Sequence, residues 1–226
     1  MRVLAAFDKC KDSLSAREIC SLAKETIQNR SLEDQVSVVP LTDGGEGFTD
    51  LLTSAKGGLF HSVFAKDSLG RTKEVKVGII SSDDVDPALQ EFINLPCPGK
   101  IAVIEMSSIA GLADLMNDER NPWLTSTFGV GQLLKHVTSL EMSSILLGIG
   151  GSSTNDMGVG ALCSLGVKFF DDSGFPVTFP CPDTWSNIKE VSAEGLFSLP
   201  PIRIACDVSN QLLGEGGATY QFGPQK

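Results

Sequence analysis

The sequence Ser144-Ile-Leu-Leu-Gly-Ile-Gly-Gly-Ser-Ser-Thr-Asn-Asp156 joins a short apolar run directly to a loop of glycines, hydroxyl side chains and one carboxylate. An apolar run of this length is typical of a strand that is buried on both faces of a parallel sheet. The residues that follow predict a helix near 157–165, ended by Gly166. A strand, a glycine-rich loop and a helix in this order predict one unit of an α/β fold.

The same order of strand, polar loop and helix recurs along the chain. Apolar runs predict buried strands at 3–7, 36–41 and 101–106. Ser15 and Glu18 fit a capping box at the start of a helix. Another helix is predicted after Thr125-Ser-Thr127, and its inner face consists of Val130, Leu133, Leu134 and Val137. Strands that alternate with helices predict a parallel sheet covered by helices.

Two segments interrupt this alternation. Residues 59–80 alternate in hydrophobicity around a turn, which predicts an antiparallel hairpin. Residues 167–208 contain short strands separated by a proline-rich stretch. We therefore expect a second, smaller α+β domain inserted into the parallel α/β domain. The expected ranges are 1–58 and 99–166 for the first domain, and 59–98 and 167–226 for the second.

Composition excludes several classes of protein. The 18 Lys and Arg against 28 Asp and Glu give a formal net charge of −10, which disfavours nucleic acid as a partner. No run of eighteen apolar residues predicts a membrane span. Six cysteines without a C-x-x-C pair, in a chain with two His, disfavour a zinc site. These features predict reduced cysteines and a cytoplasmic protein.

Polar residues directly after the predicted strands are candidates for a functional site, because ligands of open parallel sheets bind beyond the carboxyl ends of strands. The loop at 8–13 places Lys11 beside a helix N-terminus, which favours an anion such as phosphate; a solvated loop is the alternative. The loop Asp43-Gly-Gly-Glu46-Gly47 carries two carboxylates that can hold Mg²⁺ or orient a hydroxyl. A turn in which Asp43 binds its own backbone is the alternative there.

Three further loops follow predicted strands. Glu105 ends an apolar strand, where a solvated strand end explains it as well as a site does. The loop at 148–156 can offer backbone N–H groups, hydroxyls and Asp156 to phosphates and a metal. It is neither a Walker A loop nor a G-x-G-x-x-G fingerprint. Asp207 and Asn210 follow the strand at 202–208, and a capped turn explains them equally well.

Together these stretches resemble the type I glycerate kinases, the bacterial family that phosphorylates glycerate with ATP. The resemblance spans the whole chain in family order. The matching stretches are Asp8 with Lys11-x-Ser13-Leu-Ser-Ala16, Asp43-Gly-Gly-Glu-Gly47, Ala102-Val-Ile-Glu-Met106, Asn121-Pro with Thr125-x-Thr127-x-Gly129, Gly148-Ile-Gly-Gly-Ser-x-Thr-Asn-Asp156, Cys206-Asp-Val-x-Asn210 and Phe222-Gly-Pro-Gln-Lys226.

The resemblance implies a two-domain α/β architecture in which one domain is Rossmann-like or flavodoxin-like. It also implies transfer of the ATP γ-phosphoryl group, with Mg²⁺, to a hydroxyl of D-glycerate to give 2-phosphoglycerate or 3-phosphoglycerate. Within that scheme the candidate catalytic residues are Asp8, Lys11 and Asp43, and the candidate metal ligand is Asp156. The candidate residues for substrate or nucleotide binding are Ser13, Gly44, Gly45, Glu46, Glu105, Thr127, Gly150, Gly151, Ser152, Thr154, Asn155, Asp207 and Asn210.

Alternatives to this function remain open. The same loops suit a kinase for a related small hydroxy acid, or a ligand-binding domain without catalysis. Family members continue well past the Gly-Pro-Gln-Lys226 motif, so we expect this chain to be the N-terminal part of a longer kinase, with exposed apolar surface and a tendency to self-associate. The sequence leaves the assembly state open, with a homodimer as one alternative.

Overall fold

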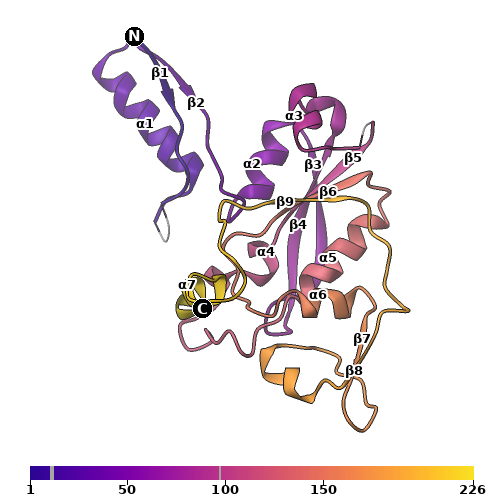
Figure 1. Cartoon of the computed structure of the whole chain (residues 1–226). Coiled ribbons are helices and arrows are strands. Elements are labelled where there is room, and N and C mark those ends of the chain that lie inside the picture. Colours follow the sequence, from indigo (N-terminus) through magenta and orange to yellow (C-terminus); the bar gives the residue numbers. More distant parts are fainter. Residues whose placement is uncertain (11–12, 97) are drawn as a thin grey trace.

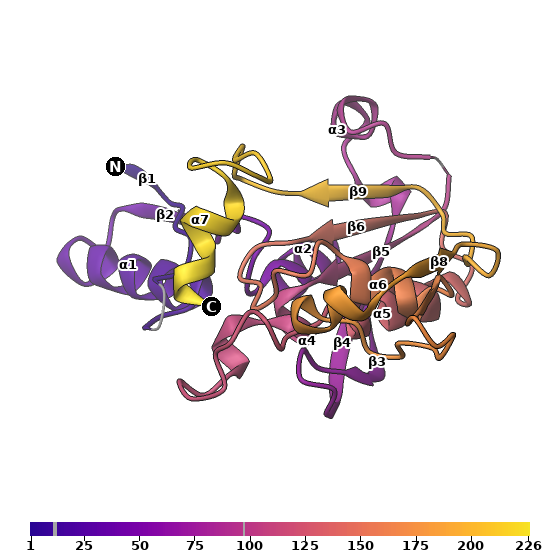
Figure 2. The same ribbon diagram turned by 60° about the horizontal axis from the view of Figure 1, so that its bottom comes forward.

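A five-stranded sheet forms the centre of the protein (Figure 1). The structure is a computed structural model that describes residues 1–10, 13–96 and 98–226. The strands, in spatial order, are β3 (Leu59–Lys66), β4 (Thr72–Ser81), β5 (Lys100–Glu105), β6 (Ser144–Gly148) and β9 (Ile202–Ala205). The β3–β4 and β4–β5 pairs are antiparallel, whereas the β5–β6 and β6–β9 pairs are parallel. Figure 2 shows β9 beside β6 at one edge of this sheet.

Helices cover both faces of the sheet. Helix α2 (Phe48–Ala55) packs through Phe48 on the face that carries Ile101 and Val103. Helix α5 (Phe128–Thr138) packs on the opposite face, which carries Ala102 and Ile104. The four predicted inner-face residues of α5 are all buried. The alternation along β5 therefore builds one apolar core on each side of the sheet.

The N-terminal residues form a separate small unit, drawn in indigo in Figure 1. Strands β1 (Arg2–Ala5) and β2 (Gln35–Val38) form a two-stranded parallel sheet, and α1 (Ala16–Arg30) connects them. The predicted capping box of Ser15 and Glu18 is present at the start of α1. The prediction that the 3–7 strand is buried on both faces is wrong, because Leu4 is 63% exposed on the face that α1 does not cover.

The remaining elements are short and lie around the sheet. Strands β7 (Lys168–Phe170) and β8 (Glu190–Ser192) form an antiparallel pair below α6. The other helices are α3 (Pro87–Phe92), α4 (Ser107–Ala110), α6 (Val159–Ser164), α7 (Ala218–Phe222) and the 3-10 helices η1 (Ser82–Asp84), η2 (Leu112–Asp114), η3 (Pro182–Asn187) and η4 (Gly223–Gln225). None of the helices in the described ranges is long and apolar enough to cross a membrane.

The α/β class is confirmed, but the sheet is mixed and the strands group differently from the expected domains. The predicted hairpin is present as β3 and β4, and β4 pairs with β5 from Gly78↔Val103 to Ser81↔Lys100. Residues 59–81 therefore share one sheet with 100–148, whereas β1 and β2 do not join it. Hydrophobic alternation predicts a strand pair but not the third strand beside it, because that pairing is made over a long sequence distance.

Candidate active site

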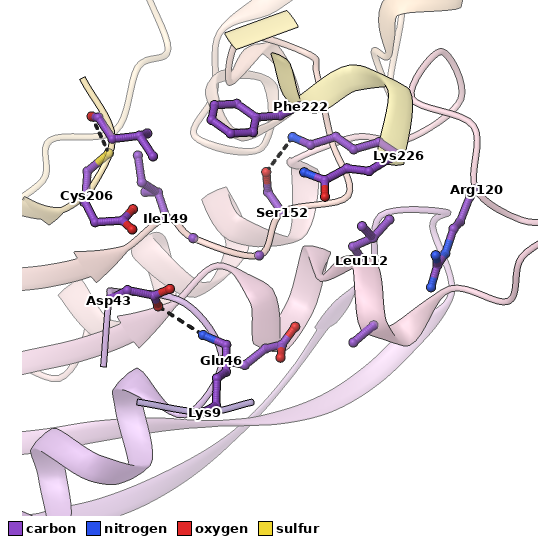
Figure 3. Close-up of a pocket in the computed structure, with 16 residues that line it drawn as sticks. Lys9, Asp43, Glu46, Leu112, Arg120, Ile149, Ser152, Cys206, Phe222 and Lys226 are labelled. Carbon is purple, nitrogen blue, oxygen red and sulfur yellow. Dashed lines mark hydrogen bonds and ion pairs between the residues drawn. The ribbon is translucent and has the colours of Figure 1, made fainter. Parts of the chain in front are cut away.

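The candidate site lies at the edge of the sheet where the parallel strands β5, β6 and β9 end. A cavity of about 340 Å³ opens there, between the N-terminal unit and the loops that follow β6 and β9 (Figure 3). This is the position at which ligands of α/β sheets bind. The cavity is lined by Lys9, Asp43, Glu46, Leu112, Ala113, Arg120, Ile149, Gly150, Gly151, Ser152, Cys206, Asp207, Val208, Phe222, Gln225 and Lys226.

An ion pair between Lys9 and Asp43 forms one wall of the cavity. Lys9 Nζ donates to Asp43 Oδ1 at 3.1 Å, and the N–H of Gly45 donates to the same oxygen at 2.8 Å. Partial burial opposes both charges, but these hydrogen bonds and the mutual attraction outweigh it. The pKa of Lys9 is raised and the pKa of Asp43 is lowered. Both groups therefore carry their charges at neutral pH.

Lys226 lies on the opposite wall, beside Phe222 from α7 (Figure 3). Its ammonium donates to Ser152 Oγ at 2.8 Å and to the carbonyl oxygen of Thr154 at 2.7 Å. No carboxylate forms an ion pair with it within the described ranges. Burial lowers the pKa of Lys226, and the charge of Asp156 opposes that shift. A partly buried cation whose direct hydrogen-bond acceptors are neutral oxygens attracts an anion.

The glycine-rich loop after β6 forms the base of the cavity between these two walls. The N–H of Gly150 donates to the carbonyl of Gly44 at 3.2 Å, and the N–H of Ser153 to that of Ala110 at 2.8 Å. In the part of the chain that the structure describes, the N–H groups of Gly151 and Ser152 have no such acceptor. Those two groups, which line the cavity, remain available to a ligand.

Gly44 of the 43–47 loop and Gly148 at the end of β6 pack closely against neighbouring backbone. A Cβ on Gly44 would lie 2.6 Å from the carbonyl oxygen of Ala205, and its φ is +89°. A Cβ on Gly148 would lie 2.3 Å from the carbonyl oxygen of Gly44. Gly44 and Gly45 do not line the cavity. Their lack of side chains lets the loop lie directly against the ends of β6 and β9, which carries Asp43 and Glu46 to the cavity.

Asp156, the predicted metal ligand, does not line the cavity and lies in a network of hydrogen bonds. Only 1% of the residue is exposed. Its Oδ2 accepts hydrogen bonds from the N–H and Oγ1 of Thr127 and the N–H of Gly160, and its Oδ1 accepts one from the N–H of Gly158. Through these hydrogen bonds Asp156 and Thr127 join the starts of α5 and α6.

Glu105 is also a buried internal carboxylate. Its Oε2 accepts from the N–H of Thr49 at 3.2 Å, and its Oε1 accepts from Ser107 Oγ at 2.7 Å. Burial raises its pKa, although these hydrogen bonds oppose the shift. Glu105 therefore fixes the start of α2 on the end of β5, and through α2 it supports the 43–47 loop.

The other predicted residues are distributed around the cavity. Glu46, Gly150, Gly151, Ser152 and Asp207 line it, as Asp43 does. Asp8 accepts from the N–H of Lys9 at 2.6 Å, and Ser13 lines a neighbouring hollow that shares Lys9 and Glu46. The side chains of Thr154, Asn155 and Asn210 do not line the cavity; Asn210 binds the carbonyl of Gly216. Lys11, predicted as catalytic, lies outside the described residues.

Sequence reasoning missed three cations of the cavity: Lys9, Arg120 and Lys226. Lys226 ends a motif that the family resemblance included, and Arg120 directly precedes the Asn121-Pro motif. Lys9 stands two positions before Lys11 and next to Asp8. Each of the three cations therefore lies in or next to a motif or candidate residue of the sequence analysis. The local sequence did not show which basic side chain turns toward the cavity.

The residues present fit a magnesium ion that arrives together with phosphates. No group of three or more His, Cys, Asp and Glu in the described ranges lies close enough to hold a metal by itself. Mg²⁺ is commonly held by one or two carboxylates together with substrate phosphates. Asp43, Glu46 and Asp207 bring such oxygens to the cavity.

Comparisons with known proteins identify relatives of this chain. The chain is 37% identical over 230 residues to a glycerate kinase of Haemophilus influenzae, and 32% identical over 229 residues to glycerate 2-kinase of Escherichia coli K12. Each match covers all of this chain and 56% of the relative. A solved structure described as a putative glycerate kinase 2 from Salmonella typhimurium LT2 matches with a TM-score of 0.74 and 30% identity, over 100% of this chain and 57% of that one.

The chain thus spans little more than half the length of these relatives. The model of the glycerate kinase family matches residues 3–226, which is nearly all of the sequence. This protein belongs to the glycerate kinase family.

Proposed function

We propose that the chain provides the phosphate-binding part of a kinase that transfers the γ-phosphoryl group of ATP to a hydroxyl of D-glycerate. The product would be 2-phosphoglycerate or 3-phosphoglycerate. The observation that carries this proposal is the partly buried ammonium of Lys226, which binds the glycine-rich loop and has no ion-pair partner among the described residues. The names of the relatives support the choice of glycerate as the acceptor.

The phosphates would bind between Lys226 and the loop at 150–152. Lys226, the N–H groups of Gly151 and Ser152, and Arg120 at the cavity wall provide positive charge and donors there. In phosphoryl transfer most catalysis comes from positioning and from stabilising charge on the phosphoryl oxygens. These groups supply that stabilisation.

The carboxylates across the cavity would position the metal and the acceptor hydroxyl. Mg²⁺, held by Asp43 with Glu46 or Asp207, would neutralise charge on the phosphates. The lowered pKa of Asp43 makes its carboxylate a weak proton acceptor, so it is better suited to orienting a hydroxyl than to removing its proton. Asp8, which binds the backbone of Lys9, acts by fixing the Lys9–Asp43 pair.

A ligand-binding role without turnover is the second candidate, because this chain spans 56% of its kinase relatives. The two roles are separated by measuring binding and turnover on the same preparation. Calorimetry with ATP and Mg²⁺ reports binding, and coupled ADP release with D-glycerate reports turnover. Hydroxypyruvate and small sugar acids test a related acceptor, and NMR of the product distinguishes the phosphorylated oxygen.

The kinase proposal predicts both binding and glycerate-dependent ADP release. Binding without ADP release favours the second candidate. Failure of ATP to bind would overturn both. Lys226→Met should weaken ATP binding, whereas Lys24→Met, on the exposed side of α1, is the matched control and should not.

We also propose that the protein works in the reducing cytoplasm. The five described cysteines, at positions 10, 20, 163, 181 and 206, are all free. Free thiols throughout a folded chain are typical of that compartment.

A further inference from the structure

An aromatic groove of about 550 Å³ lies beside the cavity. Its walls include Trp123, Trp185, Tyr220, Leu213, Met157 and Pro224. Trp123 is 63% exposed and Tyr220 is 68% exposed. Large aromatic side chains that gather on the surface in this way mark a site for a ligand or partner.

The groove continues the lining of the cavity along several segments of the chain. Ser152 lines the cavity and Asn155 lines the groove; Arg120 lines the cavity and Trp123 lines the groove. The segment 219–226 likewise contributes residues to both hollows. Positions three residues apart lie within about 11 Å of each other. The cavity and the groove therefore lie side by side along these three segments.

The chemistry of the groove differs from that of the cavity. None of its lining residues in the described chain is Asp, Glu, Lys, Arg or His. Such a groove suits neither the phosphates of a nucleotide nor the carboxylate of glycerate. Trp and Tyr rings stack with planar aromatic rings, and this stacking tolerates any base.

One polar side chain of the groove can recognise the edge of such a ring. The side chain of Asn155 makes only long contacts with Thr219 Oγ1, at 3.4 and 3.5 Å, and these contacts are exposed to solvent. Its amide offers both a donor and an acceptor to a ligand.

We propose that this groove binds the nucleobase of the nucleotide whose phosphates enter the cavity. The inference rests on the proposed function, since it takes the phosphate end of the ligand as fixed at Lys226. It adds a subsite, formed by Trp123, Trp185 and Tyr220, that binds the base by stacking.

The chain allows a direct optical test, because its only two tryptophans are Trp123 and Trp185 and both line the groove. ATP with Mg²⁺ should change the intrinsic tryptophan fluorescence in a saturable way. Tripolyphosphate with Mg²⁺ carries the phosphates without a base, so it should bind the cavity and leave the fluorescence unchanged. Equal fluorescence changes with the two ligands would overturn the proposal.

Variants then test the subsite by calorimetry. Trp123→Leu should weaken ATP binding about tenfold, which corresponds to the loss of one stacking contact. It should leave the affinity for tripolyphosphate unchanged. Phe175→Leu, at an exposed aromatic outside both hollows, is the matched control and should alter neither affinity. Circular dichroism checks that each variant is folded.

The outcomes separate this inference from the proposed function. If ATP and tripolyphosphate bind equally and Trp123→Leu changes neither affinity, the groove is not the base site and the phosphate site stands. If neither ligand binds, the proposed function fails. Adenosine, which carries the base alone, then still tests the groove through tryptophan fluorescence, and the absence of any change would overturn the inference as well.

Discussion

Lys226 and Lys9 are two ammonium groups of one cavity with opposite electrostatic surroundings. Asp43 accepts a hydrogen bond from Lys9 and raises its pKa, whereas Lys226 has only neutral acceptors and its pKa is lowered by burial. An arriving phosphate would supply the opposite charge that Lys226 lacks. Binding should therefore raise the pKa of Lys226 back toward that of an exposed lysine.

This difference between the pKa values of Lys226 and Lys9 predicts that ATP binding weakens at alkaline pH. As pH rises from about 7 toward 10, Lys226 should lose its proton before an ordinary lysine does, and ATP affinity should fall with it. Lys9 should keep its proton through the same range because its pKa is raised. Calorimetric titrations at a series of pH values measure this loss.

Two variants assign the loss to one side chain. Lys226→Arg keeps a positive charge at high pH, so the fall in affinity should disappear. Lys226→Met should weaken ATP binding about tenfold to a hundredfold at neutral pH, the usual range for a hydrogen bond to a charged group. An unchanged alkaline fall in Lys226→Arg would show that another group causes it.

The sequence predicted candidate residues at the cavity where the end of a strand fixes the position of the loop that carries them. Asp43, Glu46 and Ser152 were found because a predicted strand ends directly before each loop, and all three line the cavity. Lys9 and Arg120 were missed because a long side chain reaches several positions, and its direction depends on distant neighbours. The sequence did not show that Asp156 joins two helices, because a carboxylate that caps a helix and one that binds a metal have the same sequence pattern.

At the level of elements, Asp156 joins two helices. Its carboxylate connects the starts of α5 and α6 through Thr127, Gly158 and Gly160. Asp156→Asn puts an amide NH₂ where an acceptor is needed and leaves backbone donors unsatisfied. We expect it to lower the free energy of unfolding by about 1–3 kcal/mol. Denaturant unfolding measures this change.

The same variant distinguishes a helix junction from a metal site. Asp156→Asn should leave the Mg²⁺ dependence of ATP binding unaltered in the folded protein. Asp118→Asn, at an exposed position, is the matched control and should change neither quantity. Normal stability together with a lost Mg²⁺ dependence would restore the metal-ligand role.

Elements whose signals are local were predicted well. The Ser15–Glu18 capping box and the apolar face of α5 match the structure because in both each residue lies within four positions of the next. Strand pairing depends on partners far along the chain. Residues 72–81 were thus expected in a second domain, although β4 pairs with β5 in the main sheet.

At the level of the whole molecule, the N-terminal unit exposes an apolar face. By strand alternation Leu4, Val39 and Leu41 lie on one side of β1 and β2, and all three are exposed. Two parallel strands alone are an unusual arrangement, because parallel sheets are normally covered on both faces. We therefore expect the chain to self-associate through this face as its concentration rises.

Light scattering during size-exclusion chromatography tests this expectation. Leu4→Thr should shift the association to higher concentration by removing apolar area at its centre. Leu32→Thr, at an exposed position before β2, is the matched control and should have little effect. A constant monomeric mass at every concentration would contradict the expectation.

The order of strands in the main sheet also has a consequence for how the chain folds as it is synthesised. From β3 to β9 the spatial order follows the order of synthesis, and the first pair is a local hairpin. Each later strand pairs with a sheet edge that earlier residues have already formed. Pairing of a new strand therefore does not depend on a strand that is synthesised after it. On the ribosome this sheet can therefore grow by adding one strand at a time.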